Sequence, residues 1–173
     1  VMMAGQIPTP CLQFAAKTKK LSGGIMITAS HNPPEYNGIK PCSADGVEIS
    51  RKDELRVEKI YYNRQFSKVD QTSKTFDDQN IITEYLDRVV SLINVEKIKS
   101  RSFKVVMDLG NGVQTLVAPY LLKKLGCQVV TINSNIYGDF SGRGPELSVD
   151  NLTTLFTMVR DLHADLGVAY DGD

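Results

Sequence analysis

The stretch KVVMDLGNGVQTLVAPYLLKKLGCQVVTI, residues 104–132, decides the fold class of this 173-residue chain. It begins and ends with apolar runs of strand length, residues 104–108 and 128–132. Between them, apolar residues over 113–125 recur at helical spacing and stop at Gly126, a residue typical of the end of a helix. The stretch therefore predicts a strand, a helix and a second strand.

The same alternation continues on both sides of this stretch. Residues 150–163 predict a second helix with Asp150 as its cap, and residues 166–170 predict a third strand. A further helix is expected over residues 81–93, ahead of the first strand. Strands that alternate with helices indicate a parallel sheet joined by right-handed crossovers.

The first half of the chain predicts another unit of helices and strands. Its expected elements are a helix over 10–20 capped by Thr9, a buried strand over 25–29, a loop over 30–38, a hairpin over 38–50 that turns at Asp45-Gly46, and a polar surface helix over 52–63. Residues 65–80 are rich in polar side chains, and we place a domain junction there, between domains 1–79 and 80–173. The predicted fold class is α/β, with two mixed or parallel sheets flanked by helices.

The composition argues against several classes of function. The 20 basic and 20 acidic residues balance, which gives no support for a nucleic-acid partner or an anionic membrane surface. The longest apolar runs are far shorter than the roughly 20 residues that span a bilayer. The three cysteines are widely spaced, which argues against a disulfide framework or a zinc site and favours a reducing cytoplasm.

Several side chains that can take part in catalysis or binding lie in the loop that follows the strand predicted over 25–29. They are Ser30 as a nucleophile, His31 and Lys40 as sources of protons or positive charge, and Asn32 and Asn37 as amide donors to phosphate oxygens. A proline pair restricts the path of the loop. This combination suits phosphoryl transfer, but a plain turn capped by serine and asparagine stays open as an alternative. No GxSxG elbow supports a serine hydrolase.

The last three residues, Asp171-Gly172-Asp173, follow the strand predicted over 166–170. Ligands of open α/β sheets bind at the carboxyl ends of the strands. Two aspartates that flank a glycine can direct hard oxygens at one Mg²⁺ ion. A solvated turn is the alternative, because Asp-Gly is a common turn dipeptide.

Three segments together resemble the α-D-phosphohexomutase family, which includes phosphoglucomutase, phosphomannomutase and phosphoglucosamine mutase. TASHNPPEYNGIK, residues 28–40, resembles the phosphoserine loop of that family. GQIPTP, residues 5–10, resembles the segment that precedes that loop, and ADLGVAYDGD, residues 164–173, resembles its metal-binding loop. The resemblance covers nearly the whole chain and implies the α/β fold of the first two domains of a four-domain enzyme.

The resemblance also implies roles for the site residues. Ser30 would carry the phosphate and contribute to the metal site, His31 would belong to the catalytic loop, and Lys40 would assist proton transfer. Asp171 and Asp173 would be two of three aspartate ligands of Mg²⁺, with the third beyond residue 173. Residues 1–79 would be the later part of the first domain, and 80–173 most of the second.

Two other segments agree with the resemblance. Residues 106–112, VMDLGNG, are similar to a strand and turn of the family, and we interpret Asn111 and Gly112 as structural residues that tolerate positive φ. Residues 140–147, FSGRGPEL, are similar to a family segment that usually reads Pro-Glu-Pro, from which Leu147 departs. We interpret Arg143 in this segment as a surface arginine, with contact to an anion as the alternative.

The implied reaction interconverts hexose 1-phosphate and hexose 6-phosphate through phospho-Ser30 and a bisphosphorylated sugar. The alternatives are a phosphoglucosamine mutase, a relative that binds phosphosugars without catalysis, and a generic α/β module that binds phosphate. Because half of the substrate cleft of such an enzyme would lie outside this chain, we expect the chain alone to have little or no mutase activity.

Overall fold

The computed structural model describes residues 1–70 and 72–173, and its largest sheet has three parallel strands. These are β5 (Lys104–Asp108), β6 (Gln128–Ile132) and β7 (Leu166–Ala169), in the order β6-β5-β7. The central strand β5 pairs along its length with β6, so that Val106 lies opposite Val130. The parallel sheet expected from the alternating pattern is confirmed, and β5 and β6 have the predicted bounds.

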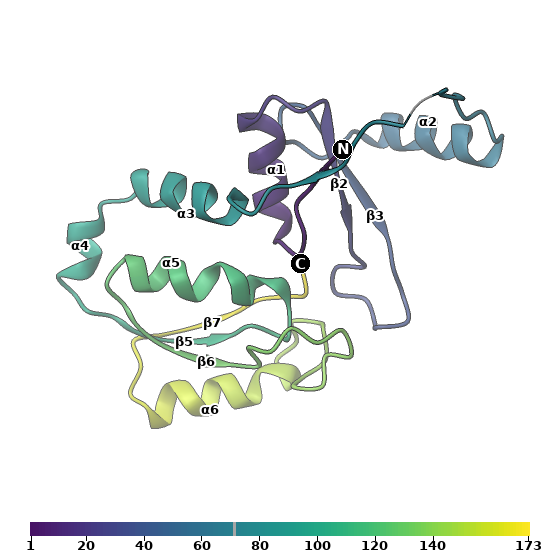
Figure 1. Ribbon diagram of the computed structural model, residues 1–173. Helices are drawn as coiled ribbons and strands as arrows, with labels where there is room; N and C mark the ends of the chain where they lie inside the picture. The colour runs from purple at the N-terminus through teal and green to yellow at the C-terminus, as the bar shows by residue number, and fades with distance from the viewer. Residues whose placement is uncertain (71) are drawn as a thin grey trace.

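Helices cover both faces of this sheet. Figure 1 shows α5 (Ala118–Lys124) on one face and α6 (Thr153–Asp161) on the other. Each follows a short 3₁₀ turn, η1 (Val113–Leu116) or η2 (Asp150–Leu152), so the expected continuous helices are each divided in two. The first division falls just before Pro119, which has no N–H to continue the ladder of hydrogen bonds.

The cap predicted at Asp150 is wrong. Asp150 is the first residue of η2, and its side chain makes no capping hydrogen bond. The hydroxyl of Ser148 instead accepts a hydrogen bond from the backbone N–H of Asn151 at 3.3 Å.

Two small sheets make up the first part of the chain. β2 (Gly23–Ile27) pairs antiparallel with β3 (Ile39–Ser43), while β1 (Met2–Met3) pairs parallel with β4 (Phe76–Asp77). The turn predicted at Asp45-Gly46 is confirmed, and the arm beyond it is reduced to a single bridge between Cys42 and Glu48. Mixed small sheets flanked by helices confirm the predicted fold class.

Helix α1 (Thr9–Thr18) packs against α3 (Ile81–Ser91) and forms the first hydrophobic core. The buried side chains of this core are Ile7, Cys11, Leu12, Ala15, Ala16, Cys42, Ile81, Leu86 and Val117. A second core lies between the parallel sheet and α5 and contains Val105, Met107, Leu109 and Ala118. Pro8, rather than the predicted Thr9, occupies the cap position of α1, because Thr9 already belongs to the first helical turn.

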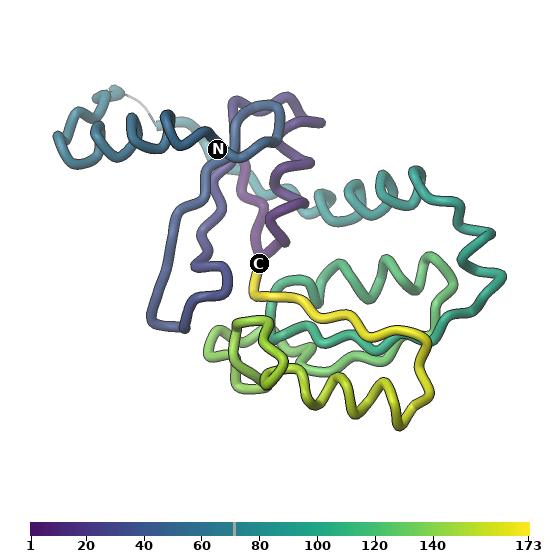
Figure 2. Tube along the Cα trace, turned by 180° about the vertical axis from the view of Figure 1, so that it is seen from behind, coloured from purple at the N-terminus to yellow at the C-terminus, as the bar shows by residue number. Residues whose placement is uncertain are grey.

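Two elements of the first part are more exposed than a core requires. β2 was expected to be buried, but Ile25 is 64% and Ile27 61% exposed, so that expectation is wrong. Helix α2 (Arg51–Tyr62) has no buried residue and extends away from the rest of the fold, as Figures 1 and 2 show.

A short helix that the sequence pattern does not predict, α4 (Val95–Lys99), follows α3. Within residues 1–70 and 72–173, no helix combines the length and apolar character needed to cross a membrane.

Candidate active site

The loop between β2 and β3 is closed by its own backbone. The N–H of Thr28 donates to the carbonyl of Gly38 at 3.1 Å. Ser30 has a φ of +55°, and its N–H donates to the hydroxyl of Thr28 at 2.9 Å. Positive φ is uncommon for a residue with a side chain, and such residues gather at functional sites. The loop therefore fixes the position of the Ser30 hydroxyl through local contacts.

Asp173 brings the two ends of the chain to this hydroxyl. Its Oδ1 accepts a hydrogen bond from Ser30 Oγ at 3.1 Å, and its Oδ2 accepts one from Lys40 Nζ at 2.9 Å. Thr9 contributes twice, from its hydroxyl to Asp173 Oδ2 at 3.3 Å and from its N–H to the Asp173 carbonyl at 3.2 Å. Figure 2 shows the C-terminus beside the start of α1, where the helix dipole favours a negative charge.

The charges of this cluster reinforce one another. The hydrogen bond and charge of Asp173 raise the pKa of Lys40 above its ordinary value, although burial opposes this. Burial by itself raises the pKa of Asp173, but the hydrogen bond and charge of Lys40, with the hydroxyls of Ser30 and Thr9, lower it overall. Lys40 is therefore a cation and Asp173 an anion at neutral pH.

A hollow of about 320 Å³ opens beside this cluster. Ser30 and Lys40 line it together with Asn32 and Asn37, so four of the predicted site residues meet there. Asn32 donates one amide hydrogen to the Ala29 carbonyl at 2.8 Å, and the oxygen of Asn37 accepts from the N–H of Gly38 at 2.9 Å. Each asparagine therefore keeps at least one N–H for a ligand. The hollow has the size and the donors for a phosphate group.

His31 and Asp171 are placed less centrally. His31 is exposed and does not line the hollow. Asp171 is half-buried and lies near enough to Lys40 to help raise the pKa of its ammonium group. Their predicted roles, as part of the catalytic loop and as a metal ligand, stay predictions.

The oxygens of Ser30 and Asp173 are of the kind that Mg²⁺ binds. Ser30 Oγ lies 3.1 Å from Asp173 Oδ1, which places a hydroxyl oxygen and a carboxylate oxygen side by side. Within the described residues, no three acidic, histidine or cysteine side chains cluster as a complete ligand set. Mg²⁺ commonly takes one or two carboxylates and completes its shell with phosphate oxygens and water. These residues therefore fit part of a magnesium shell.

Gly172 allows the two loops to approach closely. A Cβ atom on Gly172 would lie 3.0 Å from the carbonyl oxygen of Ser30 and 3.2 Å from the ring of Phe140. The carbonyl of Gly172 accepts a hydrogen bond from the N–H of Val113 at 3.4 Å. The segment that carries the two aspartates is thus held between the serine loop and the turn after β5.

Asn111 and Gly112, in the turn after β5, were predicted to be structural residues that tolerate positive φ. Of the two, only Asn111 adopts a positive φ. Asn111 has a φ of +56°, as predicted, but Gly112 has a φ of −93°, and Gly110 takes the positive value instead. Gly112 is required for another reason, because a Cβ there would lie 2.8 Å from the Gly172 carbonyl oxygen.

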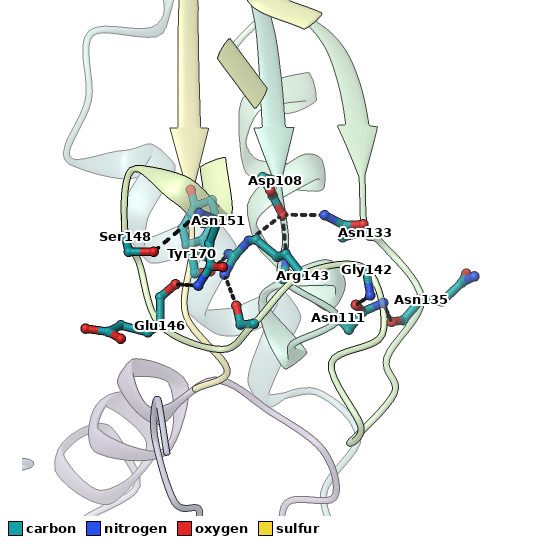
Figure 3. Close-up of polar contacts among 12 residues, drawn as sticks. Asp108, Asn111, Asn133, Asn135, Gly142, Arg143, Glu146, Ser148, Asn151 and Tyr170 are labelled. Atoms are coloured by element: carbon teal, nitrogen blue, oxygen red, sulfur yellow. Dashed lines mark hydrogen bonds and ion pairs between the residues drawn. The ribbon is translucent and has the colours of Figure 1, made fainter. Parts of the chain in front are cut away.

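Arg143 is a residue whose role the sequence pattern did not reveal. It was interpreted as a surface arginine, but its side chain is 4% exposed, so that interpretation is wrong. Figure 3 shows it beside Asp108, with which it forms an ion pair at 3.0 Å. Asp108 was the available signal in the sequence for a buried arginine, because a charged residue that ends a buried strand requires a partner.

Comparison with known proteins identifies the family of the chain. The family model described as phosphoglucomutase/phosphomannomutase, alpha/beta/alpha domain I, matches residues 1–68, and the model of alpha/beta/alpha domain II matches residues 83–173. A phosphoglucosamine/phosphogalactosamine mutase from Sulfurisphaera tokodaii is 41% identical over 98% of this chain and 38% of its own length. A phosphoglucomutase/phosphomannomutase from Thermococcus kodakarensis is 40% identical over the whole chain and 38% of its own length.

Solved structures agree with these relatives. A phosphoglucomutase/phosphomannomutase family protein from Burkholderia thailandensis superposes with a TM-score of 0.81 at 30% identity, over the whole chain and 38% of that protein. A protein described as a phosphomannomutase from Thermus thermophilus superposes with a TM-score of 0.83 at 26% identity, over 99% of this chain and 39% of its own. The chain thus spans less than half the length of these relatives, and it belongs to the phosphoglucomutase/phosphomannomutase family.

Proposed function

We propose that this chain carries the phosphoserine half of a phosphohexomutase site, which interconverts hexose 1-phosphate and hexose 6-phosphate. The observation that carries the proposal is the convergence of Ser30, Lys40 and Asp173 at one point. Ser30 Oγ and Lys40 Nζ both donate to the Asp173 carboxylate, across 143 and 133 residues of sequence. A nucleophile, a cation and a carboxylate at one strand end suit phosphoryl transfer, which depends on positioning and charge.

Each residue has a distinct role in the proposed reaction. The bond between Ser30 Oγ and phosphorus breaks while a sugar hydroxyl oxygen forms a bond to the same phosphorus. Lys40 is protonated at neutral pH and shares the Asp173 carboxylate with Ser30, so it can give a proton to the departing serine oxygen and recover one from the attacking sugar hydroxyl. The amide groups of Asn32 and Asn37 bind phosphate oxygens in the hollow. The bisphosphorylated sugar then returns its other phosphate to Ser30.

A magnesium ion at Ser30, Asp171 and Asp173 would supply positive charge to the phosphoryl oxygens. A serine phosphate carries a charge of about −1.5 to −2 at neutral pH, which Lys40 alone offsets only in part. The two aspartates without a cation would repel that phosphate. The local charge balance therefore supports the proposed cofactor.

The proposed domain organisation follows the same division as the roles. Residues 1–79 hold the serine loop, and residues 80–173 hold the parallel sheet that carries the acidic loop. The contacts of Asp173 with Thr9, Ser30 and Lys40 join the two. The complete cleft then needs parts that the longer relatives have, so we still expect little mutase turnover from this chain alone.

A phosphoglucosamine mutase is the second candidate function. It is favoured by the names of relatives, including the Sulfurisphaera tokodaii protein described above and a phosphoglucosamine mutase from Methanocaldococcus jannaschii that is 38% identical over 96% of this chain. The serine loop, residues 28–40, would serve either sugar, because the groups proposed here to bind phosphate do not distinguish the substituent at carbon 2.

The experiment compares turnover of glucose, mannose and glucosamine phosphates by the longest natural protein that contains this sequence. Ser30→Ala is expected to lower turnover of every substrate by at least about a thousandfold, because it removes the group that carries the phosphate. Ser67→Ala is the matched control, since Ser67 is fully outside the site and exposed. Wild-type turnover by Ser30→Ala would refute the proposal, and the ranking of substrates decides between the two candidates.

A further inference from the structure

Arg143 lies in the connection between β6 and α6 and reaches the carboxyl ends of two neighbouring strands. Its Nε pairs with Asp108 Oδ1 at 3.0 Å, at the end of β5. One terminal nitrogen donates to the Gly144 carbonyl at 2.9 Å, and the other donates to the carbonyl of Tyr170, directly after β7. Figure 3 shows the guanidinium between Asp108 and Tyr170.

The Tyr170 carbonyl is the first of three carbonyls that hold the acidic segment, residues 170–173, in place. Two further carbonyls follow it, at Gly172, which accepts from Val113, and at Asp173, which accepts from Thr9. The ladder of β7 ends at Ala169, and the N–H of Tyr170 still donates to the Asp108 carbonyl at 3.0 Å, so the three carbonyl contacts hold the chain beyond this last bond to the sheet. Two contacts therefore fix Tyr170 where the chain leaves the sheet, its own N–H bond to β5 and the Arg143 bond to its carbonyl, and the second is the one made by a side chain.

Stability alone gives little reason for this charged group. A buried ion pair loses the hydration of both ions, and well-packed apolar residues often serve stability equally well. Two atoms of the pair, Asp108 Oδ2 and Arg143 Nε, are buried without a hydrogen-bond partner, so the contact between the two side chains is an ion pair only. The arginine has a geometric advantage, because one planar group contacts a carboxylate and two carbonyls in fixed directions.

We propose that Arg143 is a positioning residue, which holds the Tyr170 carbonyl and so directs Asp171 and Asp173 toward Ser30. This proposal deepens the proposed function and rests on it for the meaning of the two aspartates. Among the described residues, no hydrogen bond or ion pair joins Arg143 to Ser30, and Arg143 does not line the hollow beside it.

The experiment measures amide hydrogen exchange by NMR in the 173-residue chain. The amides of Thr9 and Val113 report the position of the segment, because they donate to its carbonyls, and the amides of β5 report the sheet. Arg143→Met alone can unfold the chain by leaving Asp108 unpaired. The test variant is therefore the double substitution Asp108→Asn with Arg143→Met, beside Arg143→Lys.

In the double variant, exchange at Thr9 and Val113 is expected to become about tenfold faster relative to β5, the effect of losing one buried hydrogen bond. Arg143→Lys keeps the positive charge beside Asp108 but cannot reach both carbonyls. We therefore expect its melting temperature to be close to that of the wild type, while exchange at Thr9 and Val113 is as fast as in the double variant. Arg160→Met is the control, since Arg160 is exposed. Equal acceleration at all amides, or full protection in Arg143→Lys, would overturn the proposal.

A Mn²⁺ titration separates this proposal from the proposed function. Mn²⁺ replaces Mg²⁺ and broadens nearby signals, so we expect broadening at Ser30 and Asp171 in the wild type and at least about fivefold weaker binding in the double variant. Absence of broadening in the wild type would refute the magnesium site, while the amide exchange still decides the role of Arg143. Equal Mn²⁺ affinity in wild type and double variant would contradict the role of Arg143.

Discussion

Asp173 makes more contacts to the site than any other single residue described above. It accepts hydrogen bonds from Ser30, Lys40 and Thr9. Its side chain is 12% exposed, while that of Lys40 is 32% exposed, so solvent screens the pair only in part. The pair contributes to stability as well as to the charge of the site.

Asp173→Asn is expected to lower the free energy of unfolding by about 1 kcal/mol at neutral pH, the range of a partly exposed ion pair with hydrogen bonds. The lowered pKa of Asp173 means that its contribution is present above its unfolded pKa, about 3.9, and is lost as pH falls through the folded pKa. The raised pKa of Lys40 means that its contribution is lost as pH rises through a value above about 10.4. Urea unfolding of the wild type and Asp173→Asn across pH measures the difference between their free energies of unfolding. A difference that did not change with pH would contradict this prediction.

Gly172→Ala is expected to impair the site more than the fold. The added Cβ would press on the Ser30 carbonyl and the Phe140 ring, which costs about 1–3 kcal/mol unless the loops separate. We expect the loops to separate, which lengthens the contact between Ser30 and Asp173 and lowers turnover at least about tenfold. Gly138→Ala is the control, because nothing lies within 4 Å of a Cβ at Gly138. Equal turnover in both variants would show that Gly172 has no special role.

The sequence revealed the site residues unevenly. Ser30, Asn32, Asn37 and Lys40 were predictable because they share one loop, and the pairing of Lys40 with Met26 in the hairpin turns that loop back on itself. The contact with Asp173 was not predictable from spacing, because it depends on how the two parts of the chain pack. Burial of Arg143 was hidden for the same reason.

Among the elements, α1 and α3 form the contact that joins the first part of the chain to the second. Leu86 in α3 is 5% exposed and packs in the core with α1, whereas Leu92, just after α3, is 67% exposed. Leu86→Ala is expected to cost about 2–4 kcal/mol, because it leaves a cavity between the helices. Leu92→Ala is expected to cost less than about 0.5 kcal/mol. Thermal and urea unfolding compare the two, and similar losses would contradict the packing described.

The elements that the sequence predicted best are those whose pattern reflects local contacts. β5 and β6 are strands of a parallel sheet with apolar residues at their centres, and their bounds were predicted to the residue. The helix expected over 113–125 was divided because Val117 leaves helical geometry ahead of Pro119. The exposure of β2 was not predictable, because an apolar strand does not reveal whether a neighbour covers it.

At the scale of the whole molecule, the site exists only where two parts of the fold meet. The serine loop lies between β2 and β3, and the acidic segment follows β7 of the parallel sheet. The contacts of Asp173 and the packing of α1 on α3 hold these parts together. Mg²⁺ bound across this junction would stabilise both parts together.

We therefore expect millimolar Mg²⁺ to raise the melting temperature of the wild type by a few degrees, about 1–2 kcal/mol of binding free energy. Asp173→Asn removes a proposed ligand, so its melting temperature should not respond to Mg²⁺. Glu35→Gln is the control, because Glu35 is exposed and makes no ion pair within the described residues. An equal response in Asp173→Asn would place the cation elsewhere.

The most direct test of the central claim is to locate the phosphate. The wild-type protein is incubated with glucose 1,6-bisphosphate and Mg²⁺, and its peptides are mapped by mass spectrometry. The account predicts one phosphate, on Ser30, whose formation slows at least about a hundredfold when Lys40→Met removes the adjacent cation. A phosphate on another serine, or an unphosphorylated Ser30 in a protein that turns over hexose phosphates, would contradict it.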